Sequence, residues 1–332
     1  MRTYFTEIQT AFASDLIIHL EDNEQILLAN HLGCSPAEVS AMSEAELDQK
    51  VPPELSHPVR SLQFLKQSRG VTTIVDPLAE FVPGGIPTRT LWPAATSAFT
   101  PRSRNNDLRE KLGIPDLAKV IFYHGNVHGA NFDEMRELYR AVQQLNESGH
   151  PTWLIRAGRD SPEFSQEVAP LVAPCLIELG FVKRAKDLPE LMSMADYFVQ
   201  PGLPGPFNDY RFPSKLPEFF AIGRPVILPR TNLALELTHG TDAFILERAD
   251  CDSITQAVIH LNRDPTQCKR LAEGALAFSA KRFSWSKSAA ELEQFYLENT
   301  DLEKPDDRQR EAAKLIWNTP STDASPTSQN QS

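Results

Sequence analysis

The sequence lacks most features that mark secreted, membrane-spanning or nucleic-acid-binding proteins. Its four cysteines are scattered, with no Cys-x-x-Cys pair and no histidines at zinc-finger spacing. No apolar run approaches the roughly 20 residues that a membrane-spanning helix needs, and charges interrupt residues 1–22, where a signal peptide needs an apolar core. Basic residues number 33 against 44 acidic ones, so the net charge of −11 would repel a polyphosphate. We therefore expect a soluble, cytoplasmic protein with reduced thiols, no transmembrane segment and no nucleic-acid partner.

Several catalytic motifs are missing too. We find no serine nucleophile elbow, no Walker phosphate loop and no His-Glu-x-x-His helix. Asp250-Cys251-Asp252 imitates an Asp-x-Asp metal motif, but a helical pattern follows it, so Asp252 is better explained as a helix N-cap. His124 and His128 have a spacing that can place two ligands on one helix face, but the glycines beside them favour a loop. We predict no metal and no cofactor.

Length and composition favour two domains. The chain has 332 residues, of which 41% are hydrophobic and 23% charged, a balance typical of globular proteins with substantial cores. The last fourteen residues, 319–332, contain only Thr, Pro, Ser, Asp, Ala, Gln and Asn, and cannot bury enough apolar surface to become ordered. We expect a charged and then disordered tail over residues 300–332.

The C-terminal half shows the alternation of strands and helices typical of a doubly wound α/β domain. Five short apolar runs are continuous rather than alternating, as strands of a buried parallel sheet are. They are residues 120–123, 152–155, 197–199, 225–228 and 243–246. An apolar stripe at three- and four-residue steps predicts a helix over residues 132–145. The domain should extend from about Asn105 to Arg282.

The first hundred residues are harder to interpret. Residues 15–19 and 71–76 have strand patterns, and residues 37–47 have a helical pattern rich in acidic side chains. The proline-rich stretch 77–101 is where we place the connection between domains. These features predict a smaller α/β lobe.

The most informative segment is the long loop that leads from Pro201 into a short helix. Ser214 is a natural N-cap, and Pro217 is tolerated in the first turn because amides there lack intrahelical partners. Those amides, the helix dipole and the ammonium of Lys215 together favour a diphosphate, and Glu218 can accept hydrogen bonds from a ribose. An ordinary capped connection would look similar. However, residues 183–230 carry seven basic and five acidic side chains in an acidic protein, which favours a small anionic ligand.

Four sequence elements of this half resemble a known family. They are residues 122–126, residues 180–182 with 187–191, residues 213–218 with Pro225, and residues 283–285. Over about residues 108–296 the chain is similar to the donor domain of a GT-B glycosyltransferase of the retaining, family-four (group 1) type. The resemblance implies an α/β, GT-B-like fold with two Rossmann-like lobes, of which the N-terminal one is shortened. It also implies a partial acceptor-side lobe with linker at 1–104 and a nucleotide-sugar-binding domain at 105–299.

The resemblance also implies roles for individual residues. Glu218 would bind the donor ribose, Ser214 with Lys215 and Leu216 would bind the diphosphate, and Val182 would lie near the base. Because the family's usual arginine and lysine after the first strand are absent, Lys215 or Arg211 would have to supply the charge that neutralises the departing diphosphate, and these two are the predicted catalytic residues. A glycine-containing loop after the first strand of the domain would let a sugar or phosphate approach the backbone closely. The complete set of predicted donor-binding residues is Gly125, Asn126, Val182, Asn208, Ser214, Lys215, Leu216 and Glu218.

The chain also departs from the family pattern. The family often carries another glutamate eight positions before the one at 218, and this chain has Tyr210 there. The usual arginine and lysine after the first strand are absent, and the N-terminal lobe is about half of the usual size. Our first hypothesis is a metal-independent, retaining glycosyltransferase that uses a nucleotide-diphosphate sugar and a sugar, lipid or small-molecule acceptor. The alternatives are a binding module that does not transfer sugar alone, and a sugar-nucleotide epimerase on the same fold.

Overall fold

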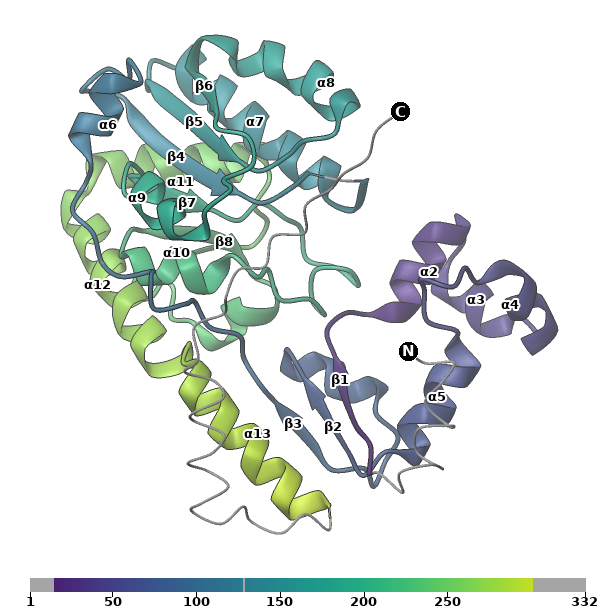
Figure 1. The fold of residues 1–332 in the computed structure, drawn as a ribbon. Coiled ribbons are helices and arrows are strands. Elements are labelled where there is room, and N and C mark those ends of the chain that lie inside the picture. The colour runs from purple at the N-terminus through teal and green to yellow at the C-terminus, as the bar shows by residue number, and fades with distance from the viewer. Residues whose placement is uncertain (1–14, 128, 301–332) are drawn as a thin grey trace, which may run out of the picture.

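Two parallel β-sheets organise the protein, and the computed structural model describes residues 15–127 and 129–300. The larger sheet has the strand order β6-β5-β4-β7-β8-β9 and the smaller one β1-β2-β3, with every pairing parallel (Figure 1). This confirms the predicted α/β fold with two lobes, the N-terminal one small. The tail predicted to be disordered lies outside the described residues from position 301 onward.

The strands of the larger sheet follow the predicted apolar runs. They are β4 (Lys119–His124), β5 (Thr152–Ala157), β6 (Leu176–Glu178), β7 (Tyr197–Val199), β8 (Val226–Pro229) and β9 (Phe244–Leu246). Only β6 was missed, because it is a three-residue edge strand without a fully buried side chain. The other five are buried by helices on both faces, which explains their continuous apolar character.

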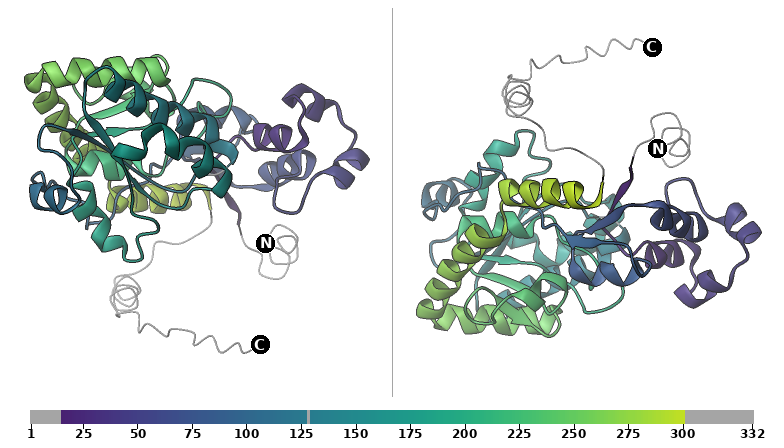
Figure 2. Two further views of the ribbon diagram at one scale, coloured as in Figure 1. Left: turned by 90° about the horizontal axis from the view of Figure 1, so that it is seen from above. Right: turned by 90° about the horizontal axis from the view of Figure 1, so that it is seen from below.

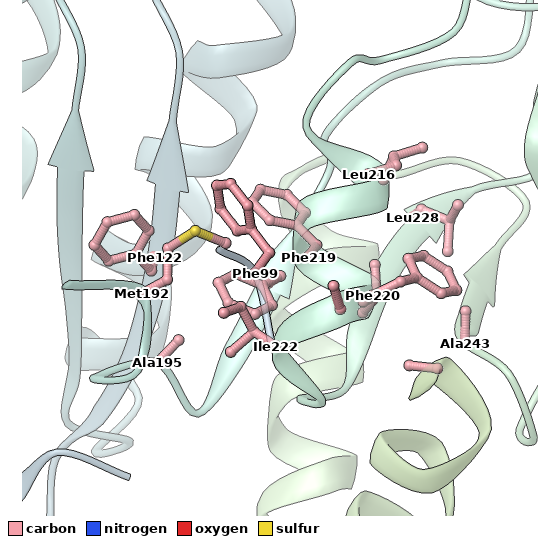
Figure 3. Close-up of a cluster of buried hydrophobic side chains, with 14 of the residues drawn as sticks. Phe99, Phe122, Met192, Ala195, Leu216, Phe219, Phe220, Ile222, Leu228 and Ala243 are labelled. Carbon is pink, nitrogen blue, oxygen red and sulfur yellow. The ribbon is translucent and has the colours of Figure 1, made fainter. Parts of the chain in front are cut away.

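Side chains alternate along these strands between two cores. Ile121 and Tyr123 face one core, to which α7 (Phe132–Glu147), α8 (Pro162–Val172) and α11 (Cys251–Arg263) contribute. Phe122 faces the other, which is built with α9 (Leu188–Met192), α10 (Leu216–Ile222) and α12 (Pro265–Arg282) (Figure 3). Helix α6 (Asn106–Lys111) borders this second core. Burial of each large apolar side chain contributes about 1.5–3 kcal/mol, so these two cores hold the larger lobe together.

The smaller lobe consists of β1 (Ile17–Leu20), β2 (Gly70–Thr73) and β3 (Thr88–Thr90). Four helices separate β1 from β2, namely α2 (Glu24–Leu32), α3 (Pro36–Ala41), α4 (Glu44–Lys50) and α5 (Pro58–Gln67). The helix predicted at 37–47 is two helices, because Ser43 and Glu46 form a capping box that starts α4. The stretch predicted as a connection, 77–101, also supplies β3 and most of the 3-10 helix η2 (Asp76–Phe81).

The last described helix, α13 (Trp285–Asn299), leaves the larger lobe and runs beside the small sheet (Figures 1 and 2). Its Phe295 is buried against Gly70 of β2, and Glu298 forms an ion pair with Arg89 of β3 at 2.9 Å. The two lobes are therefore tied together by the C-terminal helix as well as by the connection near residue 100. None of the helices within the described ranges is long and apolar enough to cross a membrane.

Candidate functional site

The order of strands in the larger sheet defines where a ligand is expected. From β4 the chain adds β5 and β6 on one side and then β7, β8 and β9 on the other. In an open parallel sheet, ligands bind beyond the carboxyl ends of the strands at such a switch point. Here that place lies between the residues that follow β4 and the long loop that leads from β7 into α10. Most of the predicted site residues come from these two segments.

A buried pair connects the two segments. Nε2 of His124, the last residue of β4, lies 2.8 Å from Oε2 of Glu218 in the first turn of α10. Both atoms are buried, the contact does not have the geometry of a hydrogen bond, and neither atom has a hydrogen-bond partner among the described residues. Burial lowers the pKa of His124, although contact with Glu218 opposes this shift. Sequence analysis gave no role to this pairing, because nothing local shows that the two residues meet.

Lys215 lies over the start of the β4 loop. Its Nζ is 4.9 Å from the centre of the Tyr123 ring, a cation–π contact. Among the described residues no carboxylate lies within ion-pair distance of this ammonium. Gly125 has φ of +114°, and a Cβ there would lie 3.3 Å from Cε of Lys215. The backbone conformation therefore favours glycine at this position, and a Cβ there would also displace the lysine side chain slightly.

Arg156 of β5 supports the same loop from below. Its side chain is 2% exposed, and its guanidinium donates to the carbonyl oxygens of Tyr123 at 2.9 Å and Gly125 at 3.0 Å. Asp160 compensates the charge with an ion pair of 2.5 Å. Sequence analysis missed this arginine. A charged residue inside an otherwise apolar strand is the signal that could have drawn attention to it.

The β7–α10 loop is held by a carboxylate from α7. Glu134 accepts from Arg211 at 2.9 Å and from the amide of Asn208 at 2.6 Å. The guanidinium of Arg211 also lies 4.4 Å from the centre of the Phe207 ring. Both Arg211 and Asn208 are thus engaged in fixing the loop, and the charge of Arg211 is largely offset by Glu134.

The start of α10 differs from the prediction. Ser214 does not cap the helix; α10 begins at Leu216, and its N-cap is Lys215, which makes no side-chain capping bond. The amide of Leu216 instead donates to the carbonyl oxygen of Pro213 at 2.9 Å, so Ser214 lies within a turn that precedes the helix. The side chain of Leu216 is fully buried in the core (Figure 3), which leaves only its backbone to face a ligand.

Two of the predicted residues lie on the β5–β6 side of the switch point. Oδ1 of Asn126 accepts from the amide of Arg159 at 2.9 Å, which joins the loop after β4 to the loop after β5. Val182 follows β6, two strands away from β4. Beside it, Phe181 is 59% exposed and has the guanidinium of Arg159 at 5.3 Å from its ring centre. Gly125, Lys215 and Glu218 are therefore grouped together, while Val182 lies to one side.

The smaller lobe meets the β7–α10 loop directly. Nδ2 of Asn23 donates to the carbonyl oxygen of Pro206 at 3.3 Å, and the hydroxyl of Tyr210 donates to Glu80. Tyr210, which stands where the family often has a glutamate, thus faces the other lobe. Burial raises the pKa of Asp22, and the nearby Arg211 opposes the shift.

Two smaller predictions concern the Asp250–Asp252 segment and His128. Asp250, and not Asp252, is the N-cap of α11, because its carboxylate accepts from the amide of Ser253 at 3.1 Å. His57 is buried and caps α5. His128 lies outside the described residues. In the part of the chain that the structure describes, no three His, Cys, Asp or Glu side chains are grouped closely enough to hold a metal ion.

Two sizeable cavities lie in the smaller lobe and contain none of the predicted site residues. One of about 600 Å³ lies beside α4 and α5, and one of about 450 Å³ lies between the small sheet and α13. The switch-point residues are therefore singled out by topology and chemistry rather than by cavity size.

The fold is shared with GT-B glycosyltransferases of known structure. Anabaena HepE, solved with UDP and glucose, is 16% identical with a TM-score of 0.65, over 89% of this chain and 74% of that one. Sucrose-phosphate synthase from Thermosynechococcus elongatus is 17% identical with a TM-score of 0.61, over 90% and 76%. WaaG, a glycosyltransferase involved in lipopolysaccharide biosynthesis, is 15% identical with a TM-score of 0.61, over 87% and 80%. At these identities the likeness establishes the fold.

A family model supplies the second comparison. Residues 118–264 match the model described as glycosyl transferases group 1, and a search of curated proteins found no match. Over residues 118–264 the chain thus matches a group 1 glycosyltransferase domain, and its fold is that of GT-B glycosyltransferases. This confirms the predicted resemblance to a group 1 GT-B glycosyltransferase and, at the level of domain and fold, the prediction of a glycosyltransferase enzyme, while the family-four assignment stays a prediction. The matched region contains every predicted site residue.

Proposed function

We propose that the protein transfers a sugar from a nucleotide-diphosphate sugar to an acceptor held between the lobes, by a metal-independent, retaining reaction of the family-four type. The observation that carries this proposal is the position of Lys215. Its ammonium lies at the switch point without a carboxylate partner among the described residues, next to Gly125 and in the same short segment as Glu218. A partly buried cation in such a place favours an anionic ligand.

The chemistry proposed is electrostatic. Lys215 stabilises the negative charge that develops on the departing diphosphate, while Gly125 and the backbone amides of Ser214 and Lys215 let its oxygens approach; the amide of Leu216 already donates to Pro213. Arg211 is the second proposed cation, with a smaller effect because Glu134 offsets its charge. No side-chain nucleophile is needed if the acceptor attacks from the face that the diphosphate leaves.

The rest of the donor is assigned on the same basis. Glu218 binds the ribose, Val182 and Asn126 lie toward the base, and Asn208 lies toward the sugar. Residues 105–299 are proposed as the donor-binding domain and residues 1–104 as the acceptor side. Anabaena HepE, which is similar in fold, was solved in complex with UDP and glucose and with UDP-glucose, so UDP is the first nucleotide to test. A cytoplasmic location is proposed from the four unpaired cysteines.

Thermal unfolding with UDP, GDP, ADP and dTDP tests the donor site. A ligand that binds only the folded state stabilises it by about 2.7 kcal/mol at a hundred times its dissociation constant. We expect one diphosphate to raise the melting temperature, and Glu218→Ala to abolish that shift without lowering the melting temperature of the free protein by more than a few degrees. Glu273→Ala, at an exposed position of α12, is the control. An equal shift in wild type and Glu218→Ala would remove the assignment.

A module that binds nucleotide sugar without transferring it is the second candidate. Two observations favour it: the small sheet has three strands, and Arg211 is paired with Glu134. Incubation of the purified chain with the selected donor separates the candidates. Release of free diphosphate or sugar, lost in Lys215→Ala, supports the transferase. Binding without any turnover supports the module, and isomerisation of the donor would point to an epimerase.

A further inference from the structure

The contact between His124 and Glu218 restricts how the site can bind a ribose, if the proposed function is correct. A carboxylate offers two oxygens, and two adjacent hydroxyls of a ribose can engage both. In this protein Oε2 of Glu218 is buried and lies 2.8 Å from Nε2 of His124. Oε1 has no partner among the described residues, and the side chain is 24% exposed. A ligand therefore meets one oxygen of Glu218 and not two.

His124 is held firmly in this position. The side chain is 13% exposed, and its ring packs edge-on against Phe219 at 5.3 Å and an interplanar angle of 88°. Phe219 is fully buried (Figure 3), and its ring stacks on that of Phe198 with 4.5 Å between the ring centres. Rotation of the imidazole away from Glu218 would require these rings to move, and tightly packed cores resist such displacement.

The chemistry of the pair also determines which imidazole nitrogen of His124 carries the proton. Burial lowers the pKa of His124, which favours the neutral ring near pH 7. A neutral ring that faced the carboxylate with a bare Nε2 would place two lone pairs against each other. The proton therefore resides on Nε2, where it makes the 2.8 Å contact with Oε2 attractive although the contact lies outside hydrogen-bond geometry, and the imidazole closes this oxygen to other groups.

We propose that His124 blocks one carboxylate oxygen of Glu218, so that the donor site binds a single ribose hydroxyl through the other oxygen. The site then also binds nucleoside diphosphates that lack the second ribose hydroxyl. The ligand class thus includes deoxyribonucleoside diphosphates. His124 is a positioning residue in this scheme, since it acts on the nucleotide only through Glu218.

Calorimetric titration of the full chain with UDP, 2′-deoxy-UDP and 3′-deoxy-UDP tests the proposal; if the thermal test selects another base, its deoxy analogues replace these. For wild type, we expect one analogue to bind within about threefold of the parent diphosphate. In His124→Leu, Oε2 loses its contact with the imidazole and turns to the free hydroxyl, so that each analogue binds about tenfold or more weakly than the parent. His124→Gln, which keeps a donor near the position of Nε2, should restore the wild-type ratio.

The possible results separate this proposal from the proposed function. Loss of about tenfold for both analogues in wild type would overturn the single-hydroxyl site, even if His124→Leu does not fold. An unchanged ratio in a folded His124→Leu protein would overturn the role of His124. Tight diphosphate binding that is insensitive to Glu218→Ala would instead contradict the donor site itself, and with it the premise of this inference.

Discussion

The role proposed for Lys215 depends on its neighbours. A lysine at the N-cap of a helix is usually disfavoured, because its charge opposes the positive end of the helix dipole. Here no carboxylate among the described residues lies within ion-pair distance of it, and the face of Tyr123 contacts its ammonium. An arrangement that is unfavourable in the free protein becomes favourable when a diphosphate supplies the missing negative charge.

This residue yields a prediction about phosphate binding. Lys215→Met keeps an unbranched stem of similar length over the Tyr123 ring but removes the charge. We expect the affinity for UDP to fall about tenfold, the effect of one charge-assisted hydrogen bond, whereas the affinity for uridine should hardly change. Lys269→Met, at a position that is 79% exposed, is the matched control. Equal losses for UDP and uridine would show that Lys215 acts on folding or on the nucleoside, not on the phosphates.

For single residues, the sequence predicts which side chains belong to the candidate site better than it predicts which side chains they contact. Lys215 and Glu218 stand out because they share one helix start with a proline and a preceding loop. The contact of Glu218 with His124 depends on α10 and β4 coming together across the switch point, and the contact of Arg156 with Gly125 depends on the register of β4 against β5. Neither follows from local spacing. The N-cap was misassigned because Ser214 lies in a turn that precedes the helix.

Among the elements, the loops after neighbouring strands of the larger sheet form a connected series. The amide of Gly158, after β5, donates to the carbonyl oxygen of Gly180, after β6, at 2.8 Å. The backbone of Gly158 also lies so close to Gly125 that a Cβ at position 158 would fall inside 3.0 Å of the Gly125 carbonyl oxygen. The position of the loop after β4 is thus set by the loop after β5.

This contact predicts that Gly158→Ala disturbs the site from a distance. Residue 158 has φ of +132°, so alanine is strained there and also displaces Gly125. We expect a loss of about 1–3 kcal/mol in the free energy of unfolding, measured with urea, and weaker binding of UDP by the folded variant. Gly84→Ala is the control, because a Cβ there meets nothing within 4 Å. Normal affinity in a destabilised Gly158→Ala protein would mean that the two loops move independently.

The predictability of elements follows their burial. Strands in the middle of the larger sheet are continuous apolar runs and were predicted, whereas β6 and β3 have three residues each and no fully buried side chain. The small lobe was predicted only in outline because its parallel strands are separated by four helices. Proline-rich sequence around β3 indicates a connection, and the strand forms only because β2 lies alongside it.

For the whole molecule, the decisive question is how so small a lobe stays folded. Its sheet has three strands, and the helices between β1 and β2 enclose a separate cluster of four buried side chains. Domains that bury little surface are marginally stable without further support. Helix α13 supplies that support from the larger lobe, with Phe295 packed on Gly70 and the guanidinium of Arg89 at 5.3 Å from the Phe295 ring centre. The stability of the smaller lobe should therefore depend on the C-terminal helix.

Phe295→Ala tests this dependence. Truncation of a buried phenylalanine costs about 3–5 kcal/mol, and we expect the loss to be confined to the smaller lobe. Amide hydrogen exchange in β1, β2 and β3 should accelerate, while β4 to β9 keep their protection and UDP still binds. Glu298→Gln, which removes only the partly exposed ion pair with Arg89, should cost less than about 1 kcal/mol. Faster exchange spread evenly over both sheets would mean that the lobes unfold as one unit, and that α13 stabilises the whole molecule rather than the smaller lobe alone.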